Sequence, residues 1–65
     1  MQILVNGELL ATDARNLAEL CASLGFIHAK VATALNGHFV VSAERGLTPL
    51  APKDEVEILA PRQGG

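Results

Sequence analysis

The last two residues, Gly64 and Gly65, offer a carboxylate with no side chain beside it. Glycine has no Cβ, so such an end can enter a narrow channel and lets another backbone approach closely. Polar and apolar residues alternate from 55 to 60, which predicts a half-buried strand, and Pro61 ends it because proline donates no N–H. A rigid strand followed by a bare end favours presentation of the carboxylate to another protein; the alternative is a frayed terminus.

Three other side chains could carry chemistry: Cys21, His28 and His38. Cys21 falls on the apolar stripe of a predicted helix, and free cysteine is among the most buried residue types, so we interpret it as core packing. The histidines lie in separate loops, and no cysteine or carboxylate spacing near them matches a zinc pattern. We interpret both as solvated surface residues, and the sequence predicts no catalytic residue and no metal site.

The size and composition of the chain limit what it can do. Its 65 residues make one small domain with little room for an internal active site. A hydrophobic content of 49% predicts a packed core, and a net charge of −2 without a basic run argues against nucleic acid or an anionic membrane as the main partner. The sequence has no apolar run long enough to span a bilayer, no signal-peptide pattern and a single cysteine, so we expect a cytoplasmic protein.

Two dipeptides, Asn6-Gly7 and Asn36-Gly37, each predict a tight turn between antiparallel strands. A type I′ turn needs positive φ at both central positions, which Asn and Gly tolerate best. A further strand precedes Pro61. The predicted strands are residues 2–5, 8–11, 31–35, 38–41 and 55–60.

One helix is predicted from Leu17 to Leu24, because apolar residues recur there at the spacing of one helical face. Asn16 can cap its first turn, and Glu19 three residues later can close a capping box with it. Gly25 follows at the place where a helix ends in a left-handed residue. The predicted apolar stripe consists of Leu17, Leu20, Cys21 and Leu24.

The segment from Ser42 to Pro52 is the least regular, and we expect Leu47 and Leu50 within it to tuck under the sheet and close the core. The element order ββαββ predicts an α+β fold, a mixed sheet of four to five strands with one helix packed across one face. A right-handed crossover makes the first and last strands neighbours, so the tail leaves from the middle of the sheet.

Alternation along the strands places Val56 and Ile58 in the core. It places a second set of side chains on the sheet face opposite the helix: Leu4, Ala32, Ala34 and Leu59. Scattered leucines on open sheets are common, but contiguous exposed apolar residues tend to mark interfaces. Because this strip lies beside the strand that feeds the tail, we interpret it as a partner-docking surface.

Five segments of the sequence together resemble those of a known protein family. They are MQILVNG at 1–7, the helix from Asn16, VATALNG at 31–37, KDEVEIL at 53–59, and Gly64-Gly65. In this order and spacing they resemble the ubiquitin-like β-grasp sulfur carriers, most closely the ThiS family of thiamine biosynthesis. The likeness covers the whole length, as a β-grasp domain over residues 1–60 and a flexible tail over residues 61–65. Two positions depart from the family's pattern: Thr33 replaces an aliphatic residue, and Lys53 stands where a glycine usually precedes the acidic residue.

The resemblance implies a carrier that other proteins act on, not an enzyme, and no stably bound cofactor. In this family an E1-like adenylating enzyme (ThiF-like) uses ATP and magnesium to adenylate the terminal carboxylate, here that of Gly65. Sulfur from a cysteine desulfurase relay then replaces AMP and leaves a thiocarboxylate, from which a thiazole synthase (ThiG-like) takes the sulfur. Gly64 and Gly65 are then the sulfur-carrying end, and Arg62 and Gln63 join the docking surface.

Two alternatives stay open. The small subunit of molybdopterin synthase is also a sulfur carrier, but it is usually longer and richer in aromatic residues and prolines ahead of its Gly-Gly. A ubiquitin-like protein modifier, or a plain β-grasp interaction domain, would share the fold without the sulfur chemistry. A thiocarboxylate on the isolated protein separates a carrier from an interaction domain, and isopeptide adducts reveal a modifier.

Overall fold

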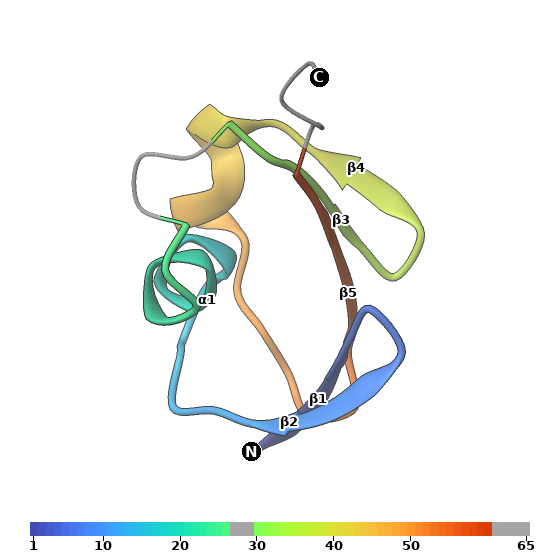
Figure 1. The fold of residues 1–65 in the computed structure, drawn as a ribbon. Helices are drawn as coiled ribbons and strands as arrows, with labels where there is room; N and C mark the ends of the chain where they lie inside the picture. The colour runs from blue at the N-terminus through green and yellow to red at the C-terminus, as the bar shows by residue number, and fades with distance from the viewer. Residues whose placement is uncertain (27–29, 61–65) are drawn as a thin grey trace.

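The computed structural model describes residues 1–26 and 30–60. His28 and the predicted tail, with Arg62, Gln63, Gly64 and Gly65, lie outside the described residues. Within them, five strands form one curved sheet, with an α-helix and a 3₁₀ helix on the same side of it (Figure 1). The elements are β1 (Gln2–Val5), β2 (Glu8–Ala11), α1 (Leu17–Ser23), β3 (Ala32–Leu35), β4 (His38–Val40), η1 (Ser42–Leu47) and β5 (Glu55–Leu59).

The central strand of the sheet is β5, the last strand of the chain, because the strand order is β2-β1-β5-β3-β4. β1 pairs with β5 in parallel, and the other neighbouring strands pair antiparallel. The predicted adjacency of the first and last strands is therefore confirmed. The mixed sheet with a helix over one face is the α+β arrangement that the β-grasp resemblance implies.

Both hairpin turns have the backbone that their Asn-Gly dipeptides predict. All four residues have positive φ, as both central positions of a type I′ turn require. The angles are 51° and 84° at Asn6 and Gly7, and 50° and 85° at Asn36 and Gly37.

The helix begins where its cap predicts. Asn16 Oδ1 accepts a hydrogen bond from the backbone N–H of Glu19 at 2.8 Å. The capping box is not closed with Asn16, however, because the Glu19 carboxylate accepts instead from the N–H of Arg15 at 2.8 Å. The side chains of the same two residues also form an ion pair, with 3.5 Å between Arg15 Nη2 and Glu19 Oε2.

The core lies between α1 and the sheet. Leu24, expected as the last residue of the apolar stripe, is instead the C-cap of α1 and is 37% exposed, so it lies at the edge of the core. Gly25 follows with the expected left-handed φ of 91°. The buried hydrophobic residues are Ile3, Ala14, Leu17, Leu20, Cys21, Val40, Val56 and Ile58.

The prediction for Leu47 is wrong, whereas Leu50 is half-buried and packs against the core. The 3₁₀ helix η1 occupies residues 42–47 of the segment expected to be irregular. With three residues per turn, Leu47 shares the face of Glu44, which is exposed. Arg45 and Thr48 occupy the half-buried face instead, and Leu47 is 82% exposed.

Candidate functional site

The sheet face opposite α1 is open, and we call it the outer face. The strand register shows which residues lie on this face, because residues that pair across neighbouring strands point to the same side of a sheet. Leu4 pairs with both Leu9 and Glu55, and Ala32 pairs with Leu59. The outer face consists of Gln2, Leu4, Leu9, Ala11, Ala32, Ala34, Phe39, Glu55, Glu57 and Leu59.

The four docking residues expected from the sequence all lie on this face. Ala32 and Leu59 are exposed, and Leu4 and Ala34 are half-buried. Phe39, which is 69% exposed beside Ala34, also lies on this face and was not predicted from the sequence.

Leu9, 71% exposed beside Leu4, was missed as well. The positions of both residues could have been predicted from the sequence. A two-residue turn determines which residues of its two strands pair, and paired residues share a face of the sheet. The face also carries the carboxylates of Glu55 and Glu57 along its central strand, so it is not purely apolar.

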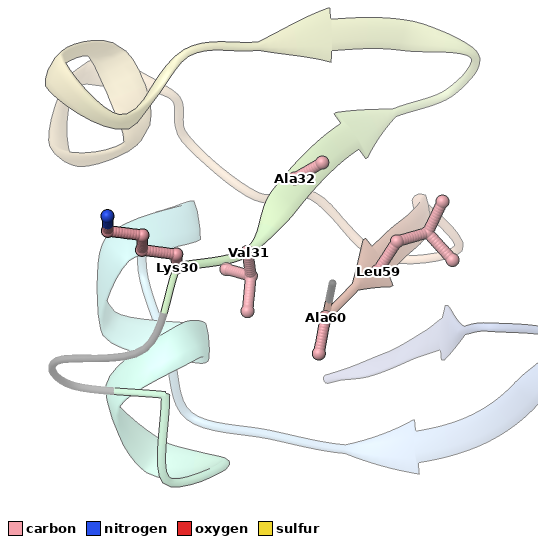
Figure 2. Close-up of a pocket in the computed structure, with 5 residues that line it drawn as sticks. All are labelled: Lys30, Val31, Ala32, Leu59 and Ala60. Carbon is pink, nitrogen blue, oxygen red and sulfur yellow. The ribbon is translucent and has the colours of Figure 1, made fainter. Parts of the chain in front are cut away.

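An open hollow of about 380 Å³ lies where β5 ends, between β5 and the start of β3. Figure 2 shows the Lys30 side chain extending away from Leu59 and Ala60, so the nearer walls are aliphatic. Val31 and Ala32 complete the lining. The hollow therefore adjoins the last described residues before the predicted tail.

Arg45 fixes the start of β3 from the side of η1. Its Nε donates to Thr33 Oγ1 at 2.9 Å, and its Nη2 donates to the Val31 carbonyl at 2.6 Å. The Thr33 hydroxyl in turn donates to the Val40 carbonyl at 2.7 Å, and its side chain is fully buried. The hydroxyl that Thr33 has in place of the family's aliphatic side chain is thus hydrogen-bonded to both Arg45 and Val40. Through its bond to the Val31 carbonyl, Arg45 also holds a residue that lines the hollow.

Replacing Thr33 with valine is expected to destabilise the fold by about 2 kcal/mol, because it leaves the Val40 carbonyl and Arg45 Nε without these partners. Thermal melting should show a midpoint lower by about 10 °C. Thr48→Val is the matched control, since it removes a hydroxyl whose hydrogen bond to the Glu44 carbonyl is exposed to solvent. An unchanged midpoint for Thr33→Val would show that the network contributes no stability.

Lys53, the other departure from the family pattern, has a left-handed φ of 73°. Glycine adopts this conformation most easily, so the turn before β5 has the geometry that a glycine would favour. The Lys53 N–H donates to the Gln2 carbonyl at 2.8 Å. The lysine is therefore accommodated in a turn that brings β5 alongside β1.

Cys21 lies in the core as predicted and is 4% exposed. Burial raises the pKa of its thiol, and the nearby Arg45 guanidinium opposes that rise. The thiol is thus both covered and held in its un-ionised, weakly nucleophilic form. His38 is exposed at the start of β4, and within residues 1–26 and 30–60 no cluster of three His, Cys, Asp or Glu side chains could hold a metal ion.

We expect Cys21 to react with a thiol reagent at least about tenfold more slowly in native than in denatured protein, because its side chain is covered and its pKa is raised. Alkylation followed by mass spectrometry measures both rates, with Cys21→Ala as the control for reaction at other side chains. Equal native and denatured rates would contradict the position of Cys21 in the core.

In the part of the chain that the structure describes, no helix has the length and apolar character needed to cross a membrane.

Comparison with known proteins points to one family. The model of the ThiS family matches residues 2–65. The crystal structure of a thiamine biosynthesis protein (ThiS) from Geobacter metallireducens is 30% identical with a TM-score of 0.83, covering 100% of both chains. A solution NMR structure of a thiamine biosynthesis protein from the same organism is 29% identical with a TM-score of 0.82, covering 100% of this chain and 88% of that one. A comparison with curated proteins gives no match.

Proposed function

Because the chain belongs to the ThiS family, we propose that it is a sulfur carrier of thiamine biosynthesis and is itself the substrate of other enzymes. The observation that carries this proposal is the extent of the family match, which runs through Gly64 and Gly65 and so includes the proposed reactive end. The Geobacter structures support it, because they are described as thiamine biosynthesis proteins and share the fold over the whole of this chain.

The proposed chemistry takes place on the Gly65 carboxylate, within the active sites of partner enzymes. A carboxylate oxygen attacks the α-phosphorus of ATP, pyrophosphate leaves, and the resulting acyl-adenylate is a good electrophile. A persulfide of a cysteine desulfurase relay then attacks the acyl carbon through its outer sulfur, and AMP leaves. A second thiol of the relay attacks the inner sulfur of the resulting acyl persulfide, which breaks the S–S bond, leaves a thiocarboxylate on Gly65 and forms a disulfide on the relay protein. ATP and magnesium are bound by the E1-like, ThiF-like enzyme, and the thiocarboxylate on Gly65 passes its sulfur to a ThiG-like thiazole synthase.

The domain's own part in this chemistry is to bind and to position. Adenylation needs the carboxylate close to the α-phosphate and in line with the leaving pyrophosphate, so most of the task is geometric. The outer face would dock on the adenylating enzyme through Leu4, Ala32, Ala34 and Leu59, together with Arg62 and Gln63 of the tail. Exposed apolar side chains on the outer face, with Leu59 at the end of the strand that leads into the tail, support this placement.

Deletion of the gene from the cells that make this protein tests the pathway. We expect growth to require added thiamine or its thiazole part, and the intact gene to restore growth without either. Growth of the deletion strain without thiamine would contradict the proposal. Loss of molybdenum-enzyme activity instead would assign the chain to molybdopterin synthesis.

A further inference from the structure

The side chain of Asn6 continues the pairing of β1 with β5 beyond the point where the main chain of β1 turns away. The Asn6 N–H donates to the Val56 carbonyl at 2.9 Å, and the chain then enters the hairpin turn with positive φ. Asn6 Oδ1 accepts from the Ile58 N–H at 2.9 Å, and Asn6 Nδ2 donates to the Ile58 carbonyl at 3.1 Å. One carboxamide thus satisfies both backbone groups of Ile58.

Asn36 has the equivalent place in the second Asn-Gly turn but binds the opposite end of β5. Its Oδ1 accepts from the Glu55 N–H at 2.9 Å, and its Nδ2 donates to Asp54 Oδ1 at 3.0 Å. Its backbone N–H donates to the Glu55 carbonyl at 2.7 Å. The two turn asparagines therefore fix the start and the end of one central strand, and only Asn6 acts at the end that leads into the tail.

We propose that Asn6 is a positioning residue for activation of the tail, an inference that rests on the proposed function. Ile58 directly precedes Leu59 and Ala60, which line the hollow at the end of the sheet. Without the carboxamide, the Ile58 N–H and carbonyl lose these hydrogen-bond partners. The free energy needed to open a strand end locally is small when its backbone groups are unpaired. In the absence of these hydrogen bonds, the end of β5 would no longer hold the start of the tail in one orientation. A displacement of about 1 Å at a reacting centre lowers the reaction rate on the order of a hundredfold.

Asn6→Gly tests the inference, because glycine keeps the positive φ of the turn and lacks the side chain that bears the carboxamide. We expect kcat for ATP–pyrophosphate exchange by the ThiF-like enzyme to fall about tenfold, with KM within about threefold because the outer face is otherwise unchanged. Amide hydrogen exchange should accelerate at Ile58 and Leu59 and not at Glu55.

Asn36→Gly is the matched control, since it removes the same group from the same kind of turn at the other end of β5. It should accelerate exchange of the Glu55 amide and leave kcat within about twofold of wild type. Equal kcat values for the two variants, or an unchanged Ile58 exchange rate in Asn6→Gly, would overturn the inference. Absence of pyrophosphate exchange with the wild-type protein would overturn the proposed function as well, so the two failures are distinguishable.

Discussion

Gly64→Ala is expected to fold like the wild type and to lose about a hundredfold of its rate of adenylation. The residue follows Pro61 in the predicted tail, beyond the strand that completes the core. An added methyl group there should leave the thermal midpoint unchanged or raise it slightly. In the adenylating enzyme the same methyl group would meet the channel walls or exclude the backbone angles needed beside the nucleotide.

Pyrophosphate exchange with the adenylating enzyme measures this effect. Gly46→Ala is the matched control, because a Cβ at Gly46 has no neighbouring atom within 4 Å and makes the same chemical change away from the tail. The control should exchange at the wild-type rate. Wild-type exchange by Gly64→Ala would show that the double glycine has no role in activation, and the frayed-terminus alternative would then hold.

Leu59→Glu is expected to raise the KM for adenylation about thirtyfold while the domain stays folded. Leu59 is 66% exposed at the end of β5, so its loss removes little core packing. A hot-spot residue at the centre of an interface contributes about 2 kcal/mol, which corresponds to this change in affinity. The carboxylate would also be desolvated on docking, at a further cost.

Leu47→Glu is the matched control, because Leu47 is 82% exposed on η1, on the helix side of the sheet (Figure 1). The circular dichroism spectra of both variants should equal that of the wild type, and only Leu59→Glu should raise KM. Equal KM values for the two variants would place the docking surface elsewhere, and unfolding of Leu59→Glu would contradict its position on the outer face.

Local signals in the sequence predicted most of the fold. Each Asn-Gly dipeptide specifies a backbone that few other pairs adopt, and Asn16 marks the helix start through one short hydrogen bond. Alternation in β5 gave the direction of its side chains, since Val56 and Ile58 are buried and Leu59 is exposed. These features depend on near neighbours in the chain, so a single sequence is enough to detect them.

Contacts between distant segments were not predicted. The Arg45 side chain forms hydrogen bonds with Val31 and Thr33, near the start of β3. The Asn6 side chain forms a hydrogen bond with Ile58, 52 positions away. Neither pairing leaves a periodic pattern, because each depends on how separate elements pack in space. Leu47 was placed wrongly for a related reason. The glycine and prolines of this segment indicated irregular structure, whereas residues 42–47 form a 3₁₀ helix. Its repeat of three residues places Leu47 on the exposed side.

The central claim is that this domain carries sulfur on its last residue, and the intact mass of the protein tests it most directly. The protein should be purified from its own cells grown without thiamine, with a culture grown in excess thiamine for comparison. We predict a fraction in which one oxygen is replaced by sulfur, and fragmentation should locate that sulfur at Gly65. Unmodified carboxylate alone in thiamine-starved cells would contradict the account.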